Sequence, residues 1–436
     1  MASPLAFQLS TNTTSTRAPP IGQALNWARR YVPTANRPLL DISQGVPGTP
    51  PPPALRDALS AAASAPGVFS YGPDEGEYEL RKAVADEMKW VYGGGDGGSD
   101  QVDIQPEDVS ITSGCNLAFV SVAMCLAQQG DEFILPVPWY MDRMTLNLLG
   151  IKTVVLQTYP EDHFQPDPER CAKLITARTR AIVLVTPNNP TGATYPPSLI
   201  SSFAALARSH NIALVIDETY RDFIATGPPH YLFHNSPSSE VASNQPPSWS
   251  WRSSIISLYS FSKSYCIPGH RLGVITASPN LLPSLLRIFD CLQICAPRGG
   301  QRAFLSKPTD DPDATSLLPS LRPFIAANRA ALSARHELFR THLPPRWHIA
   351  SHGAYYAFVR HPFVGKDAKE VCQRLAQEIG VICLPVAFFL DKEGGELREE
   401  DRYVRFSVAN VDDERITTVC ERLREAEQAF GWELDG

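Results

Sequence analysis

Short apolar runs alternate with longer helical segments along this chain, and this alternation limits its fold more than any other feature. Seven runs between residues 108 and 277 are almost continuously apolar: DVSIT, EFILPV, KTVVLQT, AIVLVTP, ALVIDE, SIISLYS and GVITA. Strands that are buried on both faces of a sheet have this character. The segments between them, such as residues 115–129 and 196–211, have helical patterns. Strands that alternate with helices predict an α/β fold whose large domain contains a mostly parallel, doubly wound sheet.

The pattern changes after residue 318. A long helical segment, residues 320–343, precedes two further strand-like runs, YYAFVR and YVRFSVA. A chain of 436 residues is also too long for one simple core. We therefore expect a large domain over residues 55–318 and a smaller α/β domain over residues 319–436. Residues 17–54 are expected to complete the smaller domain, and residues 1–16 to form a disordered leader.

Composition excludes several classes of protein. The net charge of −7 and the pI near 5.8 argue against a nucleic-acid-binding protein, which normally carries a basic face. No apolar run is long enough to span a bilayer, so no membrane partner is expected. The nine cysteines stand singly, without a CxxC pair or the spacing of metal ligands. This spacing predicts free thiols in a reducing compartment and no metal site.

The N-terminal segment has an unusual composition. Residues 1–40 contain no Asp or Glu but several Ser, Thr and Arg residues. This composition resembles a mitochondrial transit peptide, although prolines interrupt any long amphipathic helix. We favour an unstructured leader and a cytoplasmic protein, with a mitochondrial location as the alternative.

Chemically useful groups follow four of the predicted strands. In an open parallel sheet, ligands bind outside the carboxyl ends of the strands. The groups at these ends are backbone amides that open a helix, an amide side chain, a carboxylate beside a phenol, and an amine: Gly114-Cys115-Asn116, Asn189, Asp217 with Tyr220, and Lys263. We expect them to share one site, where neither a metal nor a Ser-His-Asp arrangement is needed.

Pyridoxal 5'-phosphate is the cofactor that uses all of these groups. Its aldehyde requires a lysine, its pyridine nitrogen a carboxylate, and its phenolic oxygen hydrogen-bond donors. Its phosphate suits a helix N-terminus with hydroxyls and an arginine. Lys263 is therefore predicted to hold the cofactor as a Schiff base, while Ser260, Ser262 and Arg271 hold its phosphate.

Eight motifs, in this order, carry a family resemblance: SQGVPGTPPPP, YGPDEGEYELRKAV, TSGCNLAF, PNNPTG, DETY, SFSKSY with GHRLG, GAYYAF and YVRFSVAN. Together they resemble the fold-type-I pyridoxal-phosphate enzymes of the class I/II aminotransferase family. The resemblance runs from residue 43 to residue 410 and so covers most of the chain.

The resemblance also implies roles for individual residues. Lys263 would shuttle the proton, Asp217 would pair with the pyridine nitrogen, and Asn189 and Tyr220 would donate to the phenolic oxygen. Further cofactor contacts would come from Tyr140, which stacks on the ring, and from Cys115, Asn116 and the partner subunit's Tyr71 at the phosphate. Arg405 would bind the α-carboxylate of the substrate, and Gly45 would lie in the segment that closes over it. The expected assembly is a homodimer with shared active sites.

Several of these residues also have plainer interpretations. Asp217 alone could cap a helix, Tyr71 could be a surface residue, and Cys115 could be a small hydrophobic residue that exposes its amide. Arg298 is interpreted as a loop cation rather than as a contact for an acidic side chain. The roles of His270 and Cys266 stay open.

The resemblance implies transfer of an amino group between an L-amino acid and a 2-oxo acid. The alternatives are β- or γ-elimination, as in carbon–sulfur lyases and 1-aminocyclopropane-1-carboxylate synthases, another biosynthetic reaction, or a non-catalytic regulator. TSGCNLAF, SFSKSY and QICAPRGGQRA together most resemble plant and bacterial aminotransferases that act on aromatic amino acids or methionine. An apolar pocket for such side chains is expected from Tyr140, Trp139, Tyr265 and Phe388. The insertion at residues 226–251 and Arg298 are expected near the dimer interface.

Overall fold

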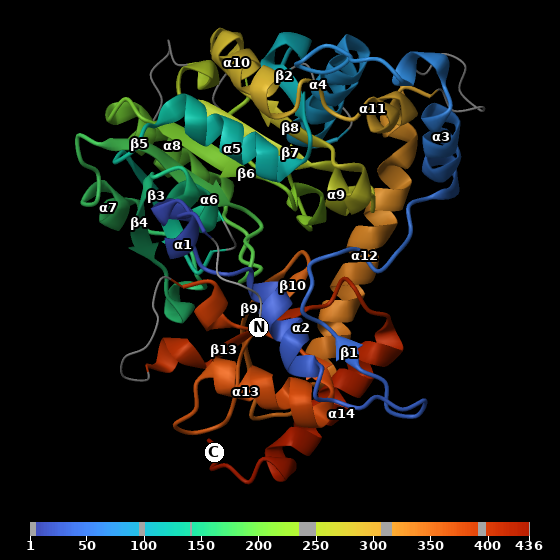
Figure 1. Ribbon diagram of the computed structural model, residues 1–436, viewed down its shortest axis with the longest axis vertical. Coiled ribbons are helices and arrows are strands. Elements are labelled where there is room, and N and C mark those ends of the chain that lie inside the picture. Colours follow the sequence, from blue (N-terminus) through green and yellow to red (C-terminus); the bar gives the residue numbers. More distant parts are fainter. Residues whose placement is uncertain are drawn as a thin grey trace.

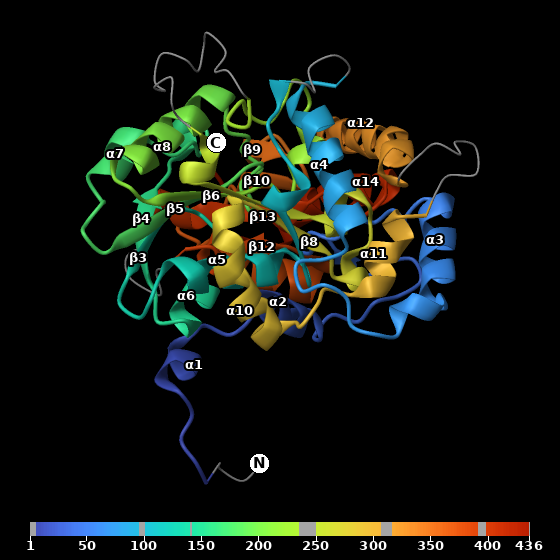
Figure 2. The same cartoon turned by 90° about the horizontal axis from the view of Figure 1, so that it is seen from above.

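A computed structural model describes residues 6–95, 101–139, 142–234, 250–306, 316–390 and 398–435. Figure 1 shows a large α/β part above a smaller part, with the long helix α12 (Leu318–His342) running from one to the other. Figure 2 shows the large part from above, with helices around its central sheet.

The large part is built on a seven-stranded sheet of order β2-β8-β7-β6-β5-β3-β4. Its strands are β2 (Val109–Thr112), β3 (Glu132–Val137), β4 (Lys152–Gln157), β5 (Thr179–Val185), β6 (Ala213–Asp217), β7 (Ile255–Ser260) and β8 (Gly273–Thr276). Strand β8 runs in the direction opposite to the other six strands of this sheet. Each predicted apolar run forms one strand, and the predicted fold class is confirmed.

Helices pack against this sheet because burying their apolar faces away from water is favourable. Helix α5 lies on β7 and β8, α8 on β5 and β6, and α4 on β2. The helices of the large part are α3 (Pro53–Ala63), α4 (Tyr78–Tyr92), α5 (Cys115–Leu126), α6 (Asp142–Leu148), α7 (Pro168–Ala172), α8 (Pro197–Ser209), α9 (Phe261–Ser264), α10 (Leu282–Leu292) and α11 (Arg298–Phe304).

The smaller part contains an antiparallel sheet of order β12-β13-β10-β9. Its strands are β9 (His348–Gly353), β10 (Tyr356–Arg360), β12 (Leu384–Pro385) and β13 (Tyr403–Ser407), and its helices include α13 (Ala368–Arg374) and α14 (Asp413–Ala429). Near the N-terminus, β1 (Leu40–Asp41) pairs in parallel with β11 (Val381–Ile382), and α2 (Pro20–Ala28) contacts α13. These contacts support our proposal that residues 17–54 belong with residues 319–436.

The segment expected to be a disordered leader is partly helical. Helix α1 (Thr11–Ser15) contacts α6, where the Asn147 side-chain amide donates to Thr16 Oγ1 over 2.7 Å. The expectation of disorder is therefore wrong for residues 11–16, because side chains of the large part provide hydrogen bonds that the sequence pattern does not reveal. Residues 1–5 lie outside the described residues.

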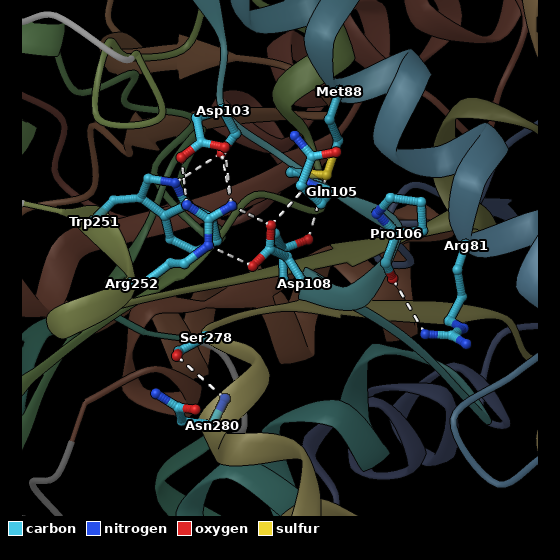
Figure 3. Close-up of polar contacts among 11 residues, drawn as sticks. Arg81, Met88, Asp103, Gln105, Pro106, Asp108, Trp251, Arg252, Ser278 and Asn280 are labelled. Carbon is cyan, nitrogen blue, oxygen red and sulfur yellow. Dashed lines mark hydrogen bonds and ion pairs between the residues drawn. The ribbon is translucent and has the colours of Figure 1, made fainter.

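The insertion at residues 226–251 is described at both ends, and residues 235–249 lie outside the described part. Its C-terminal end is anchored by Arg252, which Figure 3 shows between two carboxylates. Arg252 Nε donates to Asp108 Oδ1 over 2.7 Å, and its guanidinium also pairs with Asp103. The Trp251 indole N–H donates to the Asp103 carbonyl over 2.9 Å. This cluster fixes where the insertion rejoins the sheet, while its predicted place near a dimer interface stays a prediction.

Two kinds of feature are absent from the described ranges. No helix there is both long and apolar enough to cross a membrane. No group of three or more His, Cys, Asp or Glu side chains there is arranged to hold a metal ion.

Candidate active site

A cavity of about 230 Å³ lies where the carboxyl ends of β5, β6 and β7 meet the start of α5. Parallel strands place their final residues on one edge of a sheet, which is why side chains far apart in the sequence meet here. The lining residues are Cys115, Asn116, Trp139, Val185, Asn189, Asp217, Thr219, Tyr220, Ser260, Ser262, Lys263, Pro268 and Arg271. Nine of the predicted site residues are therefore brought together.

Lys263 provides the amine of this site. It lies on the short helix α9, directly after β7, and its Nζ donates to the Gly45 carbonyl over 2.6 Å. Burial, reinforced by the positive charges of Arg405 and Arg271, lowers the pKa of Lys263 to about 8. In a substantial fraction of molecules the Lys263 amine is therefore neutral near pH 7.5. A neutral amine can act as a nucleophile or accept a proton.

Asp217 provides the carboxylate. It ends β6, and its Oδ1 accepts the Thr219 backbone N–H over 2.9 Å. The Cys115 thiol faces the same oxygen at 4.0 Å. Burial raises the pKa of Asp217. Because Asp217 is buried, its ionised form is strongly stabilised by any cationic group that binds in the adjoining cavity.

One end of the cavity is suited to an anion. Gly114 (φ 90°) precedes α5 and lies so close to Arg271 that an added Cβ would be 2.2 Å from Nη2. Ser260 Oγ accepts the Ser262 N–H over 3.2 Å at the start of α9. The N-terminus of the twelve-residue helix α5, the arginine and the two serine hydroxyls together provide donors and positive charge.

Arg405 lies at the centre of the small sheet, on β13, and is 1% exposed. Its Nη1 donates to Asn189 Oδ1 over 2.7 Å, and its Nη2 donates to the Ser43 carbonyl. The rings of Tyr356 and Phe389 flank the guanidinium at 4.6 and 5.0 Å. These described contacts hold the guanidinium beside Asn189, which lines the cavity.

A family model described as aminotransferase class I and II matches residues 37–423. The chain belongs to this family.

Its relatives include several aminotransferases. An aspartate/prephenate aminotransferase from Thermus thermophilus is 26% identical over 80% of this chain and 83% of the relative. A valine–pyruvate aminotransferase from Mycobacterium tuberculosis is 28% identical over 85% and 87%. A solved tetra mutant of Thermus thermophilus aspartate aminotransferase, complexed with tryptophan, is 25% identical, covers 96% of this chain and 99% of its own, and has a TM-score of 0.79. This chain is therefore an aminotransferase.

Two tyrosines of the aminotransferase site were not predicted, although both lie in the GAYYAF motif. The Tyr356 and Tyr220 hydroxyls are 2.6 Å apart, and an added Cβ at Gly45 would lie 1.9 Å from the Tyr356 oxygen. Tyr355 donates from its hydroxyl to the Lys263 carbonyl over 3.1 Å. Only glycine fits at Gly45, and this pair of tyrosines fixes two of the predicted catalytic residues from the small sheet.

The expected apolar pocket is only partly present. Trp139 lines the cavity, but Tyr265 is stacked on Phe261 inside the large part and does not line it. Phe388 is stacked on Trp27 instead. The prediction is therefore wrong for Tyr265, which neighbouring rings bury. Phe388 is half-buried and lines a smaller, separate cavity together with Trp139. Tyr140, the predicted stacking ring, lies outside the described residues.

Arg298 is the first residue of α11 and not a loop cation. Its guanidinium pairs with Glu77 at 2.8 Å and donates to the Tyr71 carbonyl over 3.3 Å. Tyr71 itself is 76% exposed and lies apart from this chain's own cavity.

The two residues whose roles the sequence left open differ in exposure. His270 is exposed. Cys266 is buried with φ +56°, a conformation that favours glycine, and its thiol lies 3.7 Å from the Lys263 carbonyl. These contacts give Cys266 a packing role.

The lowered pKa of Lys263 gives a testable pH dependence in cofactor-free protein. A small amine-acylating reagent should modify Lys263 about tenfold faster at pH 9 than at pH 7, and hardly faster above pH 9. An amine with the ordinary lysine pKa would react about a hundredfold faster over the same interval. Peptide mass spectrometry measures the rate at this residue.

Removing one neighbouring positive charge tests what lowers the pKa of Lys263. Arg271→Gln removes one of the neighbouring cations, so the midpoint of the rate profile should move to higher pH. A hundredfold rise between pH 7 and pH 9 in the unsubstituted protein would contradict the lowered pKa.

Proposed function

We propose that this aminotransferase holds pyridoxal 5'-phosphate, the cofactor on which its family depends, in the cavity at the ends of β5, β6 and β7. The supporting observation is that Lys263 and Asp217 face one cavity whose other end gathers the start of α5, Arg271 and two serines. These positions suit the aldehyde, the pyridine nitrogen and the phosphate respectively. Cys115 and Asn116 would add their donors at the phosphate.

Asn189 and Tyr220 would donate to the phenolic oxygen. Burial raises the pKa of Tyr220 well above its usual value, which keeps its hydroxyl protonated and able to donate. Tyr356 would hold this hydroxyl in place through their 2.6 Å contact. The residues present therefore fit each polar group of the cofactor.

When bound, the cofactor supplies an electron sink that makes the α-carbon of an amino acid acidic. Lys263 would bond to the cofactor aldehyde, and its freed amine would carry the proton at the α-carbon. Its low pKa lets one side chain both accept and return that proton near neutral pH. Asp217 would keep the pyridine nitrogen protonated.

Arg405 and Asn189 would bind the α-carboxylate of the substrate, under the segment that contains Gly45. The donor that we propose is aromatic or methionine-like, because Trp139 lines the cavity and Phe389 lies against Arg405. Arg298 would not serve an acidic donor, since Glu77 already pairs with it. Amino-group transfer to a 2-oxo acid is the outcome named for the relatives, and elimination is not favoured.

A panel of L-amino acids with 2-oxoglutarate, read by mass spectrometry, tests this function. We expect the 2-oxo acid of each accepted donor, with phenylalanine and methionine turned over faster than aspartate. Asp217→Asn should retain the cofactor but lose turnover by at least about a hundredfold, because a neutral amide cannot keep the pyridine nitrogen charged. The control is Asp222→Asn, whose carboxylate does not line this cavity.

An eliminated fragment in place of the 2-oxo acid would contradict transamination. Near-normal turnover of the Asp217→Asn variant would mean that Asp217 is only structural.

We also propose that the enzyme is a homodimer in which Tyr71 serves the other subunit's site. Tyr71 and its neighbour Phe69 are 76% and 79% exposed, an unusual amount of aromatic surface for residues two positions apart. Arg298 fixes the backbone of this segment through hydrogen bonds to the Ser70 and Tyr71 carbonyls. A fixed, exposed aromatic segment is suited to contact with a second copy of the chain.

Mixing two inactive variants tests this arrangement. Lys263→Ala dimers and Tyr71→Ala dimers should each be nearly inactive. After dissociation and reassembly, each mixed dimer would contain one intact site, so about a quarter of the normal activity should return. Mixed dimers that form but stay inactive, or an active monomer, would contradict the shared site.

A further inference from the structure

A second cavity of about 250 Å³ lies between α4, α12 and the segment that follows Tyr220. It shares no described lining residue with the active-site cavity. Figure 2 shows α4 beside α12, and the two helices are in contact. Exposed residues 225–227 form part of its rim, so the cavity can be reached from the surface.

Arg221 is the unusual group in its wall. The residue is 4% exposed, and Nη1 makes the one hydrogen bond found for this guanidinium in the described chain, to the Tyr92 hydroxyl over 3.3 Å. Its Nε is buried without a hydrogen-bond partner in that part of the protein. A guanidinium has five N–H donors, and leaving them unsatisfied away from water is costly.

The carboxylate nearest to Arg221, that of Asp222, makes its hydrogen bonds to other residues. Asp222 Oδ1 lies 3.8 Å from Arg221 Nε, too far for a good hydrogen bond. Asp222 Oδ2 accepts the hydroxyls of Tyr259 and Ser264 over 2.6 and 2.5 Å. Arg221 therefore has an ion pair with Asp222 but no hydrogen bond to it, and the ring of Tyr259 lies 4.0 Å from its guanidinium carbon.

Two further arginines reach the cavity from α12. Arg322 is committed to Glu87 at 2.8 Å and lies 4.1 Å above the Trp90 ring. Arg329 makes only a 3.3 Å hydrogen bond to the Ile224 carbonyl within the described part of the chain. Three arginines and two carboxylates, Glu87 and Asp222, thus line the cavity, which leaves one net positive charge.

The rest of the wall includes the apolar side chains of Trp90, Val91 and Ile325. We infer that this cavity is a binding site for a small organic carboxylate, whose charged end meets Arg221 and Arg329 and whose apolar body lies against Trp90. A carboxylate would supply the acceptor oxygens that Arg221 lacks, in the paired geometry that guanidinium groups favour. Inorganic phosphate has the charge but not the apolar body.

Crystals of the holoenzyme soaked with 4-bromobenzoate give the first test. This probe has no amino or oxo group and therefore cannot react, and its bromine is located by anomalous scattering. We expect a bromine peak between α4 and α12, with the carboxylate within hydrogen-bond distance of Arg221 and Arg329. A peak in the active-site cavity alone would overturn the inference.

Calorimetry of holoenzyme variants gives the second test. An Arg405→Gln background removes the carboxylate clamp of the active site. In that background, Arg329→Gln should weaken 4-bromobenzoate binding at least about tenfold, the effect of losing one charged hydrogen bond. Arg335→Gln is the matched control, since Arg335 lies on the same helix but pairs with Asp413 at 3.0 Å, and it should leave binding unchanged.

Equal affinities with and without Arg329, or equal weakening by Arg335→Gln, would overturn the site. Inorganic phosphate that binds as tightly as the carboxylate would overturn the assigned ligand class. The crystal test uses the unsubstituted holoenzyme, so it decides the matter even if a variant does not fold.

Discussion

The hydrogen bond from Arg405 to Asn189 joins the small sheet to the large one at the centre of the site. Close to it, the backbones of Gly192 and Gly353 approach so tightly that a Cβ on Gly353 would lie 2.3 Å from the Gly192 carbonyl oxygen. These two contacts bring a buried cation from one sheet to the strand ends of the other. In the proposed site, this cation would bind the carboxylate of the amino acid beside Lys263 and Asp217.

The charges gathered at this site act mainly on the protonation of Lys263. Its amine is buried, and the charges of Arg405 and Arg271 oppose protonation while that of Asp217 favours it. A carboxylate bound at Arg405 would offset one of the opposing charges and raise the pKa of the amine. In the proposed site, substrate binding and the proton affinity of Lys263 would thus be linked through one arginine, and this link would suit a group that takes a proton from the α-carbon and later returns it.

The sequence predicted the elements that local patterns determine. Continuous apolar runs gave the strands of the large sheet, and residues such as Asp217 and Lys263 could be placed because parallel strands end at a common edge. Gly45 was placed through its motif, and the structure adds the steric reason, which is the closeness of Tyr356. Contacts between distant segments could not be predicted in this way. Four features depend on partners that no spacing rule identifies: the pairing of Arg298 with Glu77, the burial of Tyr265 among other rings, the docking of α1 on α6, and the incomplete hydrogen bonding of Arg221.

Borohydride reduction of the purified enzyme, followed by peptide mass mapping, tests the role of Lys263 most directly. Reduction fixes a cofactor bonded to an amine, so the modified residue can be read from the mass of its peptide. We expect a pyridoxyl group on Lys263 and an unmodified chain in the Lys263→Ala variant. A pyridoxyl group on a different lysine, or an adduct unchanged by Lys263→Ala, would contradict the proposed site.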